Sequence, residues 1–174
     1  VSPALQKSPG VFDDSLLRGL DCLLSEMGKR EMKAVLFLSN NWEWTGGFLQ
    51  YVNWFGGVSD SMVQRKLDWE EVRDVTARFY NCEPCKEAYL KQVEHIITRT
   101  NSVTGKKYTD DPVIMAWQLA NEPRPMRASA NEKYVEWIRK SAAFIKKLDQ
   151  HHLVSIGHEG YMGTDGDLDL FERI

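Results

Sequence analysis

Three short apolar runs constrain the fold of this chain more than any other feature of its sequence. They occupy residues 34–38, 113–121 and 153–156, and the stretches between them carry helical patterns. The first run, Ala-Val-Leu-Phe-Leu, has no polar position, as expected for a strand that is covered on both faces. Apolar strands that alternate with amphipathic helices predict parallel βα units.

The alternation predicts an α/β fold of the TIM (β/α)8-barrel class, with only a partial barrel of about three βα units in this chain. Each run ends in polar, aromatic or glycine-rich residues, and the active site of such a barrel lies at that end of its strands. A doubly wound sheet also fits the alternation, but the chain has no GxGxxG motif and no P-loop.

The length of the chain fits part of a barrel, because three strands do not close one and whole barrels typically need ~250 residues. We expect one partial barrel domain over 1–174 and no second domain. A helix is predicted over 14–30 with no strand before it, and 171–174 have the pattern of a helix interior. Both ends of the chain are therefore expected to interrupt the barrel.

Further helices are predicted from their start signals. Asp68 with Glu71 matches a capping box, and so does Ser129 with the glutamate three residues later. A third helix is predicted after Pro84 and places Tyr89 on its apolar face. The helix that starts near Ser129 places Tyr134 on its apolar face.

The composition is that of a globular protein, with 43% hydrophobic residues, 27% charged residues and a net charge of −3. This charge argues against a nucleic-acid partner. No apolar run approaches the ~18 residues that a membrane span needs, so no membrane association is expected.

Cysteine and histidine give weak signals. Cys82 and Cys85 form a CxxC pair, interpreted as a local bridge or as two thiols at a helix start, because no second ligand pair completes a metal site. We predict no metal and no cofactor. His95 is expected to be structural, and His151 and His152 are expected to be solvated at the face opposite the active site.

The strongest chemical signal is the end of the second apolar run, Asn121-Glu122-Pro123. A carboxylate at the mouth of a strand suits a glycosidase general acid if an apolar setting keeps it protonated, and Trp117 and the neighbouring loops are the candidates for that setting. Asn121 can donate hydrogen bonds to a sugar hydroxyl. The alternative is a strand-end carboxylate that caps the following turn.

A second signal is the aromatic loop that follows the first run. It begins Asn40-Asn-Trp-Glu-Trp-Thr-Gly-Gly47 and holds six aromatic residues between 42 and 55. Aromatic faces pair with the C–H-rich faces of pyranose rings, so such a loop suits a sugar cleft. Trp42 and Asn41 are the candidates for ligand contact, and most of the other aromatic residues are expected to pack the loop onto the barrel.

The third signal is Gly157-His-Glu-Gly160, which follows the last run. Its carboxylate, Glu159, is expected beside Glu122, because consecutive strands of a barrel are neighbours. We interpret Glu159 as a group that orients substrate. It can alternatively be the partner carboxylate or pair with an arginine. The two glycines predict a close approach of the backbone.

Together these motifs resemble glycoside hydrolase family 5, and specifically its endo-β-1,4-mannanases. The segment Trp-Gln-Leu-Ala-Asn-Glu-Pro-Arg-Pro resembles the acid/base motif of that family. Asn-Asn-Trp with the following Gly-Gly, Asp110-Asp-Pro and Gly-His-Glu-Gly match the same subgroup, and Arg124 favours mannanases over cellulases. The resemblance extends from just after the second barrel strand to the helix after the fifth.

The resemblance implies roles for individual residues. Glu122 resembles the general acid/base and Asn121 the residue that binds the hydroxyl next to the reacting carbon. Arg124 and Trp42 resemble sugar-subsite residues, and the substrate-positioning groups are Glu159 and Asn41. The family acts with retention and without a metal, through glutamates on the fourth and seventh strands. The second glutamate has no counterpart in this chain.

The resemblance also implies a mannan polysaccharide as substrate and a secreted, cell-surface or periplasmic location. Two alternatives remain open: a family-5 endo-β-glucanase (cellulase), and a non-catalytic carbohydrate-binding or self-assembling partial barrel. An open partial barrel exposes edge strands and an apolar inner face, so we expect association into a homo-oligomer through those edges.

Overall fold

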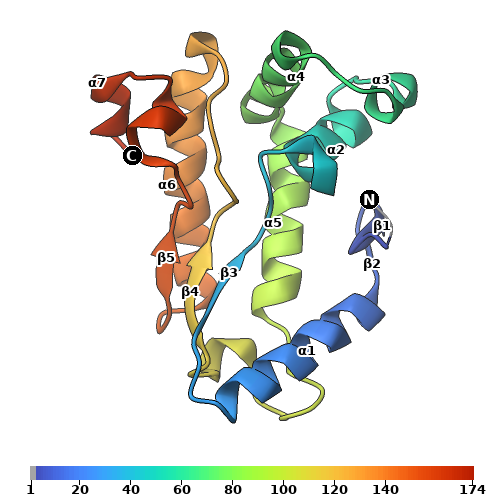
Figure 1. Cartoon of the computed structure of the whole chain (residues 1–174), viewed down its shortest axis with the longest axis vertical. Coiled ribbons are helices and arrows are strands. Elements are labelled where there is room, and N and C mark those ends of the chain that lie inside the picture. The colour runs from blue at the N-terminus through green and yellow to red at the C-terminus, as the bar shows by residue number, and fades with distance from the viewer. Residues whose placement is uncertain (1–2) are drawn as a thin grey trace.

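The computed structural model describes residues 3–174, and its centre is a parallel sheet (Figure 1). The strands are β3 (Ala34–Phe37), β4 (Ile114–Gln118) and β5 (Leu153–Ser155), in that spatial order. Leu36, Trp117 and Val154 lie side by side in the register. The predicted parallel pairing of the three apolar runs is confirmed, and the three carboxyl ends meet at one edge.

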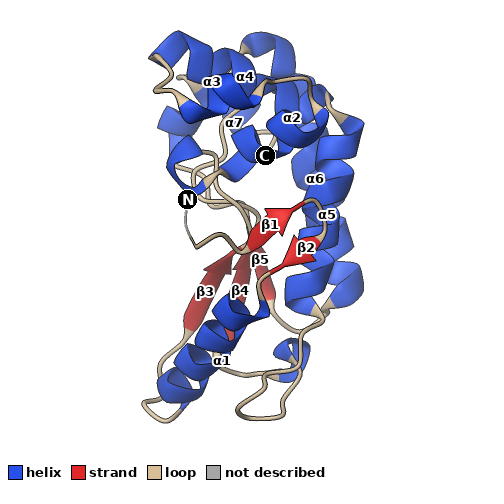
Figure 2. Cartoon of the chain, turned by 90° about the vertical axis from the view of Figure 1, so that its right-hand side faces the viewer, coloured by secondary structure: helices blue, strands red, loops and turns tan. Residues whose placement is uncertain are grey.

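Four long helices accompany the sheet. Helices α5 and α6 run alongside it, and the two helices pack against each other (Figures 1 and 2). The long helices are α1 (Asp14–Gly28), α4 (Trp69–Asn81), α5 (Glu83–Ile97) and α6 (Asn131–Leu148). The short elements are β1 (Gln6–Ser8), β2 (Val11–Phe12), α2 (Gly47–Phe55), α3 (Asp60–Gln64) and α7 (Leu168–Phe171).

Two predictions about helix ends are settled by the cap geometry. Asp68 and Glu71 form the predicted capping box at α4, where each side chain accepts from the backbone N–H of the other residue. The predicted box at Ser129 is wrong, because a 3-10 turn (η3, Ala128–Ala130) contains that serine and Ala130 precedes α6 without a side-chain cap. The helix predicted through 171–174 is also wrong, since α7 ends at Phe171.

The core lies between the sheet and the helices, where aromatic rings of α2, α4, α5 and α6 interlock edge to face. They are Phe48, Phe79, Tyr80, Tyr89, Tyr134 and Trp137, all almost fully buried. The other face of the sheet is open. Val35, Phe37, Met115 and Leu153 keep 44%, 58%, 46% and 65% of their surface exposed. The packed helices therefore fix the strand ends from one side only.

A buried polar cluster lies at the edge of the sheet opposite the carboxyl ends of the strands. Asp149 accepts hydrogen bonds from Trp117 Nε1 at 2.7 Å and lies 2.6 Å from His152 Nδ1, and His152 Nε2 is 3.0 Å from the Asp111 carbonyl. The prediction that His152 is solvated is therefore wrong, since its ring is buried between these two partners; His151 is exposed. His95 stacks on Phe12, in agreement with a structural role.

Candidate active site

Glu122 lies where the backbone leaves β4, between the loops that follow β3 and β5. Asn121 N–H donates to the Ser39 carbonyl at 2.9 Å, and Glu122 N–H donates to the Gly157 carbonyl at 3.0 Å. Glu122 has a φ of +51°, which side-chain-bearing residues rarely adopt and which costs of order 1–3 kcal/mol. Such strain concentrates at functional sites, so the conformation supports a chemical role for this carboxylate.

Gly157 is required by this arrangement. Its φ is +85°, and a Cβ atom there would lie 2.0 Å from the Ala120 carbonyl oxygen. The predicted close backbone approach is confirmed at Gly157. At Gly160 the space is open, and only its φ of +70° calls for glycine.

Three tyrosines from the helices beside the sheet hold the backbone around Glu122. Their hydroxyl groups donate to main-chain carbonyls at 2.9–3.0 Å: Tyr89 to Leu119, Tyr134 to Pro123 and Tyr80 to Arg124. Burial raises the pKa of each phenol, so all three remain hydrogen-bond donors into the alkaline range. The sequence predicts that Tyr89 and Tyr134 lie on buried helix faces, but it does not predict these hydrogen bonds. The one sequence signal for such bonds is a tyrosine, rather than a phenylalanine, on an apolar face.

The aromatic neighbour of Glu122 is Trp42, whose indole Nε1 donates to Glu122 Oε2 at 2.6 Å. Of the two expected sources of an apolar setting, a neighbouring loop supplies Trp42, whereas the expectation for Trp117 is wrong. Side chains alternate across a strand, and Trp117 points to the helix side, where it bonds to Asp149. Trp42 therefore holds one of the two carboxylate oxygens of Glu122.

Three asparagines link the loop after β3 to the segment that carries Glu122. Asn41 N–H donates to the Asn121 carbonyl at 3.0 Å, and Asn41 Oδ1 accepts from Arg124 N–H at 3.2 Å. Asn121 Nδ2 donates to Asn40 Oδ1 at 3.3 Å. Asn41 is fully buried, so the structure places it as a link between two loops; its predicted contact with substrate stays a prediction. The sequence did not single out Asn40.

Arg124 and Glu159 form a bidentate ion pair, with Nε–Oε2 at 2.5 Å and Nη2–Oε1 at 2.7 Å. Of the three interpretations of Glu159, pairing with an arginine is the one seen in the geometry. This hydrogen bonding raises the pKa of Arg124, and its guanidinium carbon lies 5.3 Å from the centre of the Trp42 ring. Both of the predicted subsite residues thus lie beside Glu122.

Some of the other aromatic residues of the loop pack against the core, as was expected for most of them. Phe48 and Tyr51 are buried in the core, and Trp54 and Phe55 lie further along α2. Trp44 stays near Trp42, and a tryptophan that the sequence did not single out, Trp69 at the first position of α4, joins them.

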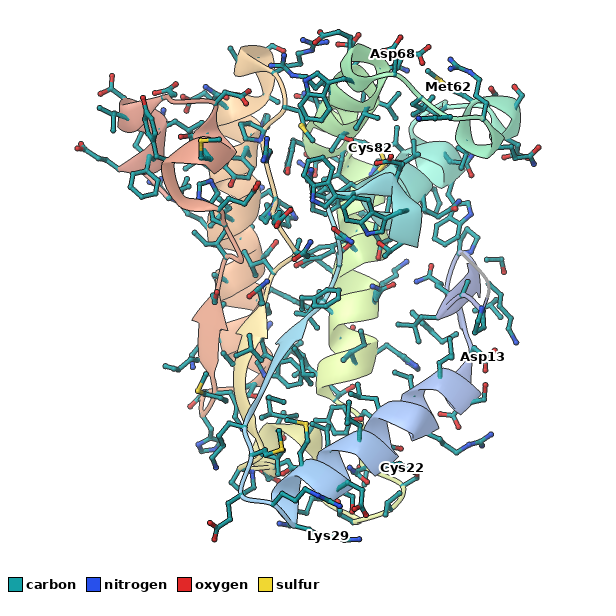
Figure 3. All side chains as sticks on the ribbon, in the orientation of Figure 1. Asp13, Cys22, Lys29, Met62, Asp68 and Cys82 are labelled. Atoms are coloured by element: carbon teal, nitrogen blue, oxygen red, sulfur yellow. A yellow bond between two sulfur atoms is a disulfide. The ribbon has the colours of Figure 1, made fainter. Side chains whose placement is uncertain are left out.

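Cys82 and Cys85 form a disulfide at the junction of α4 and α5 (Figure 3), so the local bridge is the interpretation that the structure supports. Cys22, on α1, is free and exposed. Within residues 3–174, no three His, Cys, Asp or Glu side chains come together in a way that suits a metal ion. In the same range no helix has the length and apolar character to cross a membrane.

Comparison with known proteins identifies the family of the chain. A family model described as glycoside hydrolase family 5 β-mannosidase-like matches residues 1–174. The chain belongs to this family. Its members are enzymes, glycoside hydrolases, and the relatives below group the chain with the family-5 mannanases.

Two curated relatives illustrate the likeness. The mannan endo-1,4-β-mannosidase 1 of Solanum lycopersicum is 38% identical over 161 residues, which are 92% of this chain and 38% of that protein. A putative mannan endo-1,4-β-mannosidase 4 of Arabidopsis thaliana is 36% identical over 160 residues, 92% of this chain and 36% of that protein. The chain therefore spans little more than a third of their length.

Solved structures of the family share the fold. A family-5 mannosidase from Rhizomucor miehei, in complex with mannosyl-fructose, superposes with a TM-score of 0.85 at 34% identity, over 99% of this chain and 40% of that chain. An endo-1,4-β-D-mannanase from Thermotoga petrophila gives a TM-score of 0.74 at 35% identity, over 88% and 41%. The chain has the fold of part of a TIM barrel, and the predicted fold class is confirmed at that level.

Proposed function

We propose that the protein to which these residues belong hydrolyses β-1,4-mannosidic bonds inside mannan, galactomannan or glucomannan with retention, and that Glu122 is its general acid/base. One observation carries the proposal. The Glu122 carboxylate stands at the mouth of β4 in a rare backbone conformation, with one oxygen held by the indole N–H of Trp42. The mannan substrates named for the relatives support the choice of sugar.

In the proposed reaction Glu122 gives its proton to the glycosidic oxygen while a second carboxylate attacks the anomeric carbon. Glu122 then removes a proton from the water that releases the sugar. The two carboxyl groups of a retaining enzyme stand about 5 to 5.5 Å apart. Glu159 does not suit the nucleophile's role, because Arg124 binds both of its oxygens. We therefore place the nucleophile on another strand of the barrel.

The neighbouring residues take supporting roles in this proposal. Asn121 binds the hydroxyl next to the reacting carbon, a contact that strengthens in the transition state. Arg124 and Trp42 border the adjoining sugar subsite. Glu159 orients the Arg124 guanidinium, and Asn41 holds the loop that carries Trp42 against the Glu122 turn.

The test is Glu122→Gln in a form of the protein that hydrolyses mannan. Loss of the general acid is expected to lower kcat by at least ~10²-fold on mannan. The loss is smaller on an aryl β-mannoside whose phenolate leaves without a proton. Glu43→Gln removes an exposed carboxylate from the neighbouring loop, which follows β3, and is the matched control. Near-normal mannan hydrolysis by the Glu122 variant would show the assignment to be wrong.

Two other functions are separated by simple assays. Faster hydrolysis of carboxymethylcellulose than of mannan would identify an endo-β-glucanase, against the expectation from Arg124. A non-catalytic carbohydrate-binding role is favoured by the exposed indole of Trp44. Quenching of tryptophan fluorescence by mannan, without release of reducing ends from any form of the protein, would identify that role.

We also propose that the chain comprises three consecutive βα units of the eight in a barrel and that, on its own, it associates with further copies. In the residues described, β3 and β5 form the edges of the parallel sheet, and the open face beside them is apolar. Such edges and faces favour association. Light scattering should give a mass above that of a monomer; a monomer that binds no apolar dye would contradict this.

The disulfide bears on location. Disulfides form and persist mainly in oxidising compartments, so Cys82–Cys85 supports the proposal that the protein is secreted or held at the cell surface or in a periplasm. Fractionation of the native protein, with thiol labelling of each fraction, tests this. A protein found in the cytosol with both thiols free would contradict it.

A further inference from the structure

Three indoles converge at the rim of the site from two separate segments of the chain. Trp42 and Trp44 stack with centroids 5.6 Å apart and planes 20° from parallel. Trp69, from the start of α4, lies 6.1 Å from Trp42 at 30°. Trp44 keeps 63% of its surface exposed and Trp69 47%. Neither ring belongs to the sheet face that an open partial barrel leaves uncovered, because Trp44 lies in a 3-10 turn and Trp69 at the start of α4, so the exposed surface of both indoles is available to a ligand.

The middle ring of the three, Trp42, already contacts other protein groups. Trp42 donates its N–H to Glu122, carries the Arg124 guanidinium 5.3 Å from its centre and contacts an indole on each side. The free aromatic surface therefore belongs to Trp44 and Trp69. Trp42 joins that surface to the acid, which makes it a positioning residue.

Both outer indoles are held by local structure. Trp44 lies within a 3-10 turn, η1 (Glu43–Thr45), which Gly46 closes at a φ of +84°. Trp69 is the first residue of α4 and follows directly on the N-cap Asp68 of the capping box. Because the backbone at both positions is fixed before a ligand arrives, little conformational entropy remains to be lost on binding.

We propose that Trp44 and Trp69 form an outer platform on which a polysaccharide chain lays one or more sugar rings beyond those next to Glu122. The proposal rests on the proposed function, which supplies the β-mannan chain. Two features of the site favour a sugar as the occupant: the aromatic surface is continuous with the acid through Trp42, and uncharged rings suit the C–H faces of an uncharged chain. The platform should therefore strengthen the binding of long oligosaccharides and leave short ones unaffected.

The test is calorimetric titration of the chain with mannobiose and with mannohexaose. Wild type is compared with Trp44→Ala, Trp69→Ala and the control Phe55→Ala, which removes an exposed ring at the far end of α2. Each platform variant is expected to weaken mannohexaose binding by about 3- to 10-fold. Mannobiose affinity should stay within about twofold, and the control should bind both sugars as wild type does. Near-UV circular dichroism, together with Trp44→Phe and Trp69→Phe as conservative variants, confirms that the fold is kept.

The outcomes separate the platform from the proposed function. Unchanged mannohexaose binding in both alanine variants overturns the platform. An equal loss for the two sugar lengths also overturns it, because the indoles would then act through Trp42 alone. A chain that binds neither sugar has no such platform, and hydrolysis by Glu122→Gln decides the proposed function separately. Preference for cellohexaose with the same losses in the variants overturns the mannan assignment and supports the platform.

Discussion

The hydroxyl groups of Tyr80 and Tyr134 are predicted to hold the Glu122 turn in its rare conformation. Each is fully buried and donates to a carbonyl within two residues of Glu122, at 2.9 and 3.0 Å. Replacing both with phenylalanine keeps the aromatic packing and removes only the two hydroxyl groups. The turn then retains its φ of +51° without two of the contacts that stabilise it.

The cost follows from the geometry. A net hydrogen bond contributes about 1 kcal/mol, and a buried carbonyl left without its partner costs about 1–3 kcal/mol. For two carbonyls the double variant should therefore lose about 2–6 kcal/mol of unfolding free energy. The two rings contact each other, with centroids 5.3 Å apart, so the single variants need not add to that value.

Urea unfolding followed by tryptophan fluorescence measures this loss. Tyr51→Phe is the matched control, because Tyr51 belongs to the same aromatic cluster and its hydroxyl has no hydrogen-bond partner among residues 3–174. In an active form of the protein, the double variant should also lower kcat more than the control does. A loss below about 0.5 kcal/mol, or an equal loss in Tyr51→Phe, would refute the reasoning.

Three further changes have defined outcomes. Arg124→Lys replaces the bidentate contact with Glu159 by a point charge. Urea unfolding should show a loss of about 1 kcal/mol in unfolding free energy, and the loss in the free energy of sugar binding should be larger than that. Burial raises the pKa of the Asp21 carboxyl on α1, but hydrogen bonds donated by the Arg99 guanidinium and by the Tyr108 and Ser102 hydroxyl groups overcome this and hold that pKa well below its usual range. That stabilisation is full above about pH 4 and is lost as the pH falls further, so acid titration of unfolding should be steeper for wild type than for Asp21→Asn. Reduction of Cys82–Cys85 should lower the unfolding free energy by about 2 kcal/mol, since the disulfide closes a short loop; no change in Tm with dithiothreitol would contradict this.

The strands and helices were largely predictable, because the periodic pattern of buried positions can be recognised within a short run of consecutive residues. The ends of elements were less so. Ser129 matched a capping box in the sequence, yet the preceding backbone forms a 3-10 turn that moves the helix start. His152 precedes a strand at the face opposite the active site, which suggested solvent, but the end of α6 brings Asp149 against its ring.

The site was predictable in its residues and not in its contacts. Glu122, Arg124 and Glu159 each stand out at a strand end, but the pairing of the last two joins residues 35 apart in sequence. Trp42 reaches Glu122 across 80 residues, while Trp117, close in sequence, points away from it. Contacts of this kind depend on strand register and loop path, which local patterns do not specify.

The contacts that hold Glu122 are distributed unevenly around it. The backbone of Glu122 is bonded to the loops after β3 and β5, tyrosines of α4 and α6 hold it from the helix side, and Trp42 holds its carboxylate. These contacts all lie within residues 3–174 and together outweigh the ~1–3 kcal/mol cost of a positive φ. Contacts within this segment therefore preorganise the Glu122 carboxylate. Among the described residues, the sheet face away from the helices carries no such contacts, and in the proposed reaction it is the side from which a nucleophile about 5 to 5.5 Å away has room to approach. In that proposal, positioning of the acid and supply of the nucleophile are thus separable properties of the barrel.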